Sequence, residues 1–151
     1  MTRISVQTDS REGGLPDVKE IRRWVRAALG SSGSGASLTV RIADLEECQE
    51  LNRRWRECNK ATNVLAFPSG EVDAKGHTYL GDIVICAPVV HTEARAQGKQ
   101  PQDHIAHLVI HGVLHLVGYD HQEPEAAAAM EDREIRTLAG LGIANPYILE
   151  R

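Results

Sequence analysis

The sequence predicts an α+β fold in a single domain that spans residues 1–151. Segments with strand character concentrate in the first half of the chain and helical segments in the second half, without the strict alternation of an α/β protein. The length, a hydrophobic content of 42% and a charged content of 25% are those of one ordinary globular domain. Aromatic residues make up only 4%, so we expect a core mainly of Leu, Ile, Val and Ala.

The N-terminal part of the chain is predicted to form a strand, a helix and a loop. Residues 3–8 alternate in hydrophobicity as a strand does. Residues 16–29 are predicted to be helical, with Pro16 in the first turn. The apolar residues of this helix share one face: Val18, Ile21, Trp24, Val25 and Leu29. Residues 30–35, with the sequence GSSGSG, have the composition of a flexible loop.

A second strand and a second helix follow this loop. Residues 37–43 are predicted to be the strand and residues 45–56 the helix. Asp44 is expected to cap the start of the helix, with Glu47 at the capping-box position three residues later.

Two further extended segments and three helices complete the predicted order. The extended segments are residues 62–68 and residues 78–87. The helices are expected from Pro88 to Gly98, from about residue 102 to about residue 117, and from Pro124 to Gly140 or Gly142.

The composition gives no sign of a membrane protein. No run approaches the roughly 18 apolar residues that a membrane span requires, and the N-terminus lacks the apolar segment of a signal peptide. The cysteines Cys48, Cys58 and Cys86 are odd in number and widely spaced, which favours a reducing compartment and a cytoplasmic location. The net charge of -4 gives no general attraction to nucleic acid, so any such contact depends on local basic patches.

Three histidines in the segment HGVLHLVGYDH have the spacing of a metal site. His111 and His115 are one helical turn apart, which places their Cβ atoms about 5–6 Å from each other on one face. Gly118 can take the left-handed conformation that ends a helix, so that the chain returns His121 to the same ion. Three neutral ligands with an open fourth position are typical of a catalytic zinc site.

The same spacing occurs in zinc proteases, but the residue that serves them as general base is absent. Their frame is H-E-x-x-H-x-x-G-x-x-H, and Gly112 occupies the position of the glutamate. Zinc could still activate water without that base. A phosphodiester substrate would need a cation for its developing charge, and the arginine fork suits phosphate. Of Arg53, Arg54 and Arg56, the last is best placed to face a cleft, at the junction of helix and loop.

Other polar residues near the motif have two interpretations each. His107, one turn before His111, could contact substrate or support a metal ligand. Asp120 could orient the free ring nitrogen of a ligand or be an ordinary turn aspartate. His104 continues the same helix face but is expected to be exposed, because it lies near the start of the helix.

Four segments resemble the YbeY endoribonuclease family, bacterial metal-dependent RNases of ribosomal RNA maturation. HGVLHLVGYDH resembles the family's histidine signature, LNRRWR its L-N-x-x-[YW]-R, TNVLAFP its T-[DN]-V-L-S-F-P and LGDIVIC its L-G-D-I-x-I. The match runs from Leu51 to His121, nearly half the chain. The sequence departs from the family pattern at Asn59 and Ala66, neither of which is expected to contact the metal.

The resemblance implies a small mixed sheet with about five helices and a zinc ion held on a central helix by His111, His115 and His121. It implies Arg56 as the catalytic arginine. It also implies cleavage of single-stranded RNA in maturation of the 3′ end of small-subunit ribosomal RNA and in ribosome quality control. Ribosomal RNA or ribosomal subunits would be the partners, with no role for DNA or membranes.

Two other functions stay open at this point. One is a metallohydrolase of another class, such as a peptidase, with a base recruited from elsewhere in the chain. The other is a non-catalytic ribosome-assembly factor in which zinc only stabilises the fold. The missing glutamate counts against the first, and an open ligand position counts against the second.

Overall fold

A four-stranded mixed sheet forms the centre of the protein. The computed structural model describes residues 2–56, 62–120 and 122–148, with the backbone alone at residues 32, 55 and 56. The strands, in the sheet order β1-β2-β4-β3, are β1 (Arg3–Asp9), β2 (Ala36–Ala43), β4 (Thr78–Cys86) and β3 (Val64–Val72). The first three are parallel, and β3 pairs antiparallel with β4. The expected mixed sheet is therefore confirmed.

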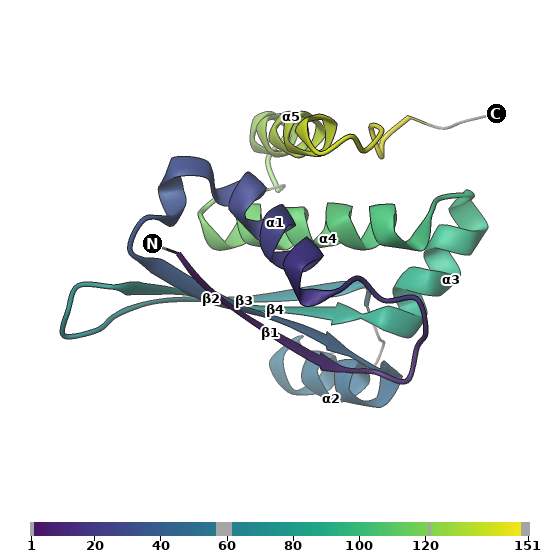
Figure 1. Cartoon of the computed structure of the whole chain (residues 1–151), viewed down its shortest axis with the longest axis horizontal. Helices are drawn as coiled ribbons and strands as arrows, with labels where there is room; N and C mark the ends of the chain where they lie inside the picture. The colour runs from purple at the N-terminus through teal and green to yellow at the C-terminus, as the bar shows by residue number, and fades with distance from the viewer. Residues whose placement is uncertain (1, 57–61, 121, 149–151) are drawn as a thin grey trace.

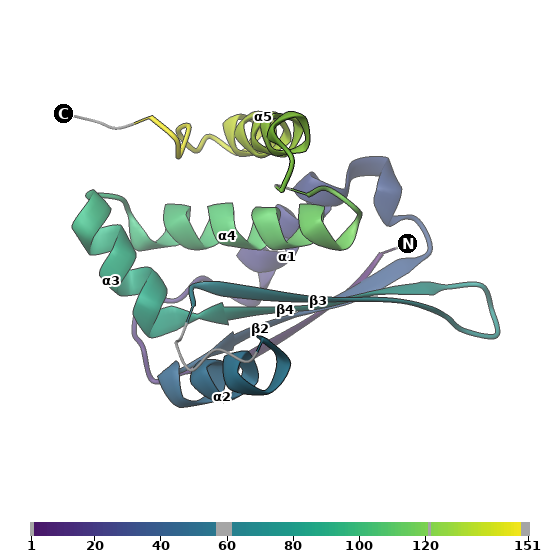
Figure 2. The same cartoon turned by 180° about the vertical axis from the view of Figure 1, so that it is seen from behind.

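Five α-helices pack around this sheet in the described ranges. They are α1 (Val18–Leu29), α2 (Leu45–Arg56), α3 (Ala87–Gln97), α4 (Pro101–Leu116) and α5 (Pro124–Gly140). Helices α1 and α4 cover one face of the sheet, α2 covers the other, and α5 lies on the outer side of α4 (Figures 1 and 2). The predicted α+β class is confirmed, and α4 is the central helix. None of the described helices is long and apolar enough to cross a membrane.

The strand β4 supplies apolar side chains to both faces of the sheet. Ile83 and Ile85 belong to the larger core, which includes most of the buried residues of α1 and α4. Val84 and Cys86 belong to a smaller core on the α2 side, together with Cys48. This two-sided burial explains why the last four residues of β4, 83–86, form a continuous apolar run, as expected for a strand covered by helices on both faces.

The first helix and the following loop differ in detail from their predictions. Asp17 caps α1 by accepting a 2.9 Å hydrogen bond from the Glu20 N–H, so Pro16 precedes the helix and does not lie in its first turn. Gly30–Gly33 forms a short 3-10 helix and not the predicted flexible loop. The Thr2 hydroxyl, which donates to the Gly33 carbonyl at 2.6 Å, ties this turn to the N-terminal segment.

The second helix begins after Asp44 as predicted, but its acidic residues have other partners. The Asp44 carboxylate accepts hydrogen bonds from the Ser10 hydroxyl and the Arg11 N–H, which follow β1. The Glu47 carboxylate binds the Arg41 guanidinium of β2 at 2.5 and 2.6 Å. The predicted capping-box role of Glu47 is therefore wrong, because a charged partner on the sheet gives a stronger hydrogen bond than a backbone N–H does.

Candidate functional site

Four histidines follow one face of α4. We call His104, His107, His111 and His115 the histidine row; their spacing of three, four and four residues keeps them on one side of the helix. The rings of His107 and His111 are 6.4 Å apart between centroids, as are those of His104 and His107. The rest of α4 is mostly apolar and buried, and this packing fixes the direction in which the row faces.

His104 is buried, contrary to its predicted exposure. Only 5% of its side chain is exposed, and its Nε2 lies 2.9 Å from Glu93 Oε1 of α3. The same oxygen accepts a 3.0 Å hydrogen bond from the Asn63 amide, which precedes β3. The prediction failed because the start of α4 is covered by α3, a contact that local sequence does not report. His104 therefore joins three segments of the chain and belongs to the scaffold of the site.

The burial of His104 predicts a pH-dependent stability. Burial lowers the pKa of this imidazole below its usual 6.5, against the opposing effect of Glu93. As the pH falls through about 6.5, the unfolded chain therefore binds more protons than the folded one does. The free energy of unfolding consequently decreases as the pH decreases. His104→Gln is expected to reduce this loss between about pH 7.5 and about pH 5.5, measured by urea unfolding. Equal losses in the two proteins would contradict the prediction.

His111 is held by a buried carboxylate from α5. Its Nδ1 lies 2.5 Å from Oε1 of Glu134, whose side chain is fully buried, whereas 27% of the His111 side chain is exposed. A carboxylate accepts hydrogen bonds, so the Nδ1–H donates and Nε2 is left as the acceptor nitrogen of the ring. This is the arrangement in which a histidine binds a metal through Nε2 while a carboxylate fixes its orientation.

The second oxygen of Glu134 binds two further groups. The Tyr147 hydroxyl donates to Oε2, and His107 Nε2 lies 3.4 Å from the same oxygen and 3.2 Å from the Tyr147 hydroxyl. Burial by itself raises the pKa of Glu134, but the hydrogen bonds from His107, His111 and Tyr147 outweigh it and hold the pKa at about 2. Burial and the Glu134 carboxylate raise the pKa of Tyr147. Glu134 is therefore an ionised acceptor at neutral pH.

Glu134 and Tyr147 were not predicted from the sequence. A signal for Glu134 exists, because it lies midway between the buried residues Met130 and Leu138 at the four-residue spacing of one helix face. A glutamate on an apolar face is rarely buried without a partner. Tyr147 lies in an irregular segment after the last helix, so no periodic spacing of apolar residues in the sequence indicates its contact with Glu134.

The remaining predicted site residues are described only in part. His115 is half-buried one turn after His111. Gly118 has a positive φ of 107° and bends the chain away from the helix end, as predicted. The exposed Asp120 accepts a 3.1 Å hydrogen bond from the Gln122 N–H, as turn aspartates do. His121 lies outside the described residues.

Arg56 is the last residue of α2. The helix α2 lies on the opposite face of the sheet from α4 (Figure 1). Its side chain lies outside the description. The structure therefore brings His107 and His111 together through Glu134, while the convergence of Arg56 with the histidines stays a prediction.

The donor set fits a zinc ion in its chemistry. Among the described residues no three His, Cys, Asp or Glu side chains are grouped to hold a metal, and the predicted third ligand, His121, lies outside them. The two described ligands are imidazoles on one helix face, and one of them has its Nδ1 already bonded to a carboxylate. Imidazole nitrogens suit zinc better than calcium or magnesium, which prefer oxygen ligands.

Gly112 contacts the sheet and leaves no room for a catalytic glutamate. A Cβ atom at this position would lie 2.9 Å from Ile83 Cγ2 and 3.2 Å from two other carbons of the same side chain. Gly112 is buried in the contact between α4 and β4. The glycine thus allows close packing of the histidine helix on the sheet, and a side chain there would point into the core.

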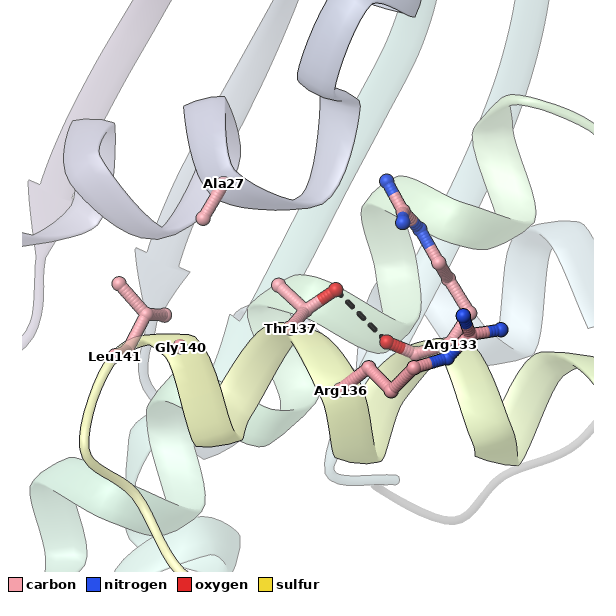
Figure 3. A pocket seen from close by; sticks show the side chains of 6 residues that line it. All are labelled: Ala27, Arg133, Arg136, Thr137, Gly140 and Leu141. Carbon is pink, nitrogen blue, oxygen red and sulfur yellow. Dashed lines mark hydrogen bonds between the residues drawn. The ribbon is translucent and has the colours of Figure 1, made fainter.

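A groove between α1 and α5 is separate from this site. It has a volume of about 280 Å³ and is lined by Ala27, Arg133, Arg136, Thr137, Gly140 and Leu141 (Figure 3). Arg136 pairs with Asp132 at 2.5 Å, and its side chain is 70% exposed. None of the predicted site residues that the structure describes lines this groove, which is a surface feature of the packing between the two helices.

Comparison with known proteins identifies the family of the chain. The family model described as Endoribonuclease YbeY matches residues 6–142. The chain belongs to the YbeY endoribonuclease family. An Endoribonuclease YbeY from Alkalilimnicola ehrlichii is 53% identical over 141 residues, which cover 91% of this chain and 85% of that protein. One from Coxiella burnetii is 43% identical over 150 residues, covering 97% and 99% of the two chains.

The fold also resembles a solved structure. The solution structure of TM1509 from Thermotoga maritima aligns with a TM-score of 0.61 and 23% sequence identity, over 98% of this chain and 99% of that one. This likeness supports the α+β architecture of the YbeY family member described above.

Proposed function

We propose that this protein is a zinc-dependent endoribonuclease that cleaves single-stranded RNA. The observation that carries the proposal is the pair His111 and His115 on the buried central helix of a chain from the YbeY endoribonuclease family, with His111 oriented by Glu134. His121 is the proposed third ligand. An open site of three imidazoles leaves a position for water or for a phosphate oxygen of the substrate.

Protein side chains bind and orient the substrate in the proposed mechanism. When bound, zinc supplies a Lewis acid and lowers the pKa of water to about 7. Arg56 is proposed to bind the scissile phosphate through its planar guanidinium and to stabilise the charge that develops on the phosphoryl oxygens. The bonds of His107 to Tyr147 and Glu134 favour a supporting role for His107 over contact with substrate. Asp120, which precedes His121 in the sequence, is proposed as a second supporting residue, one that orients the ring nitrogen of a metal ligand.

We infer that ribosomal RNA is the natural substrate, and that the protein acts in the cytoplasm on the 3′ end of small-subunit RNA and in ribosome quality control. A net charge of -4 gives little general attraction for an RNA backbone. Weak intrinsic affinity is therefore expected, with the ribosomal subunit presenting the single strand to the site.

A panel of substrates tests the reaction class. The purified zinc-loaded protein is incubated with a single-stranded RNA, the same RNA in a duplex, a single-stranded DNA of the same sequence and an unstructured peptide. Cleavage of the single-stranded RNA alone is expected. Cleavage of the peptide alone would identify a metallohydrolase of another class. Absence of all cleavage, together with unfolding on zinc removal, would identify an assembly factor with structural zinc.

Substitution of Arg56 tests the arginine assignment. Arg56→Ala is expected to lower kcat/KM for single-stranded RNA about a hundredfold, the scale seen when one charge-stabilising donor is lost. Arg53→Ala is the matched control, because Arg53 lies on the same helix, pairs with Glu50 at 2.6 Å and is 58% exposed. Equal kinetics for Arg56→Ala and wild type would remove Arg56 from the site.

A further inference from the structure

Glu134 is an unusual residue for the interior of this protein. Its side chain has no exposed surface, and it lies on the face of α5 that carries Met130 and Leu138 into the core. Burying a carboxylate is unfavourable unless its oxygens are bonded, and an apolar residue of similar size would pack there without that requirement. Packing alone therefore does not account for a carboxylate at this position.

The bonds of Glu134 are divided between its two oxygens in a specific way. Oε1 accepts from His111 Nδ1 at 2.5 Å, while Oε2 receives the Tyr147 hydroxyl and lies 3.4 Å from His107 Nε2. A carboxylate can rotate about its terminal torsion, which is only broadly restricted. Two partners on Oε2 fix that rotation and so hold Oε1 in the direction of His111.

Tyr147 brings the C-terminal segment into this arrangement. Its ring packs edge-on against His107 at 5.3 Å between centroids. The Asn145 side-chain oxygen accepts a 2.8 Å hydrogen bond from the Tyr147 N–H, and Lys99 Nζ donates to the Pro146 carbonyl at 3.0 Å. The segment after α5 is thus tied to Lys99, which precedes α4, at the residue immediately before Tyr147.

We propose that Glu134 is a positioning residue that sets the tautomer and ring orientation of the metal ligand His111, and that Tyr147 holds Glu134 in place for this task. The inference rests on the proposed metal site and deepens it. With Nδ1–H bonded to Oε1, Nε2 is the unprotonated nitrogen before any metal arrives. The C-terminal segment is then part of the metal site, although it lies more than twenty residues beyond the last predicted ligand.

The first test measures zinc affinity by competition with a chromogenic chelator. Glu134→Gln keeps the size of the side chain, but its amide can donate to Nδ1 and so place the proton on Nε2. Its zinc affinity is expected to fall about tenfold to a hundredfold, the range seen when a carboxylate behind a metal-binding histidine is lost. Tyr147→Phe removes only the hydroxyl and is expected to weaken zinc binding less than Glu134→Gln does.

Met130→Ala is the matched control for packing. Met130 is buried one turn before Glu134 on the same helix, and it has no hydrogen-bonding group. This variant is expected to unfold at lower urea concentration than wild type and to bind zinc with wild-type affinity. A loss of affinity in Met130→Ala as large as in Glu134→Gln would reduce the role of Glu134 to packing and overturn the proposal.

A second readout needs no variant. Nitrogen-15 NMR of the metal-free wild-type protein is expected to show the Nδ1–H tautomer of His111, and the Nε2–H tautomer would overturn the proposal even if Glu134→Gln fails to fold. Unchanged zinc affinity in folded Glu134→Gln overturns this inference alone. Failure of the wild type to bind zinc overturns the metal site of the proposed function, and this inference with it.

Discussion

Replacement of His115 by alanine is expected to abolish zinc-dependent cleavage of single-stranded RNA. The substitution removes one of the three proposed ligands, which should reduce kcat/KM by more than the roughly hundredfold loss that follows removal of a ligand's supporting partner. The side chain is half-buried near the end of α4, so the helix is expected to fold without it. Initial rates of RNA cleavage, with both proteins purified identically and incubated with the same concentration of zinc, measure the effect.

His77→Ala is the control for this experiment. His77 lies in the turn before β4, is 45% exposed and is 3.5 Å from Asp73, and it has no part in the proposed site. It should cleave RNA at the wild-type rate. Cleavage by His115→Ala at the rate of His77→Ala would show that the activity comes from a contaminating nuclease or from another part of the molecule.

Replacement of Gly112 by glutamate, the residue that zinc proteases have at this position, is expected to unfold the protein and not to create a peptidase. The side chain would enter the contact of α4 with Ile83, where even a Cβ atom comes within 2.9 Å. An uncompensated buried charge costs about 3–5 kcal/mol, a large part of the roughly 5–15 kcal/mol that stabilises a typical domain. Urea unfolding of Gly112→Glu should show a folded fraction far below that of wild type.

Gly112→Ala separates the steric effect from the charge. An extra methyl group in a packed core lowers the free energy of unfolding by about 1–3 kcal/mol. The higher helix propensity of alanine offsets up to about 1 kcal/mol of this loss. A modest loss of stability with retained zinc binding is expected. Wild-type stability in Gly112→Glu, with zinc-dependent peptide cleavage, would contradict the packing assignment and revive the peptidase alternative.

The order of elements and the direction of the histidine row follow from local sequence. The spacing of His107, His111 and His115 places them on one face of any α-helix, and the bend at Gly118 follows from the freedom of glycine at a helix end. The strands were predictable for the same reason, because alternation and apolar runs are properties of neighbouring residues.

The partners of the histidines come from distant segments of the chain, and for this reason the local sequence pattern does not predict them. Glu134 lies 23 residues after His111 and Tyr147 lies 40 residues after His107, so neither forms part of a local pattern. The burial of His104 depends on Glu93 of the preceding helix. Sequence spacing thus identifies candidate ligands, whereas the carboxylate that orients one of them emerges only when α5 packs on α4.

The measurement that tests the account most directly is the rate of RNA cleavage during zinc titration of the metal-free protein. A catalytic metal centre at the histidine row predicts no cleavage before zinc is added, a linear rise in rate as zinc is bound, and a plateau at one equivalent. Full cleavage of single-stranded RNA by the metal-free protein, or no cleavage after one zinc ion has bound, would contradict a catalytic metal centre at the histidine row.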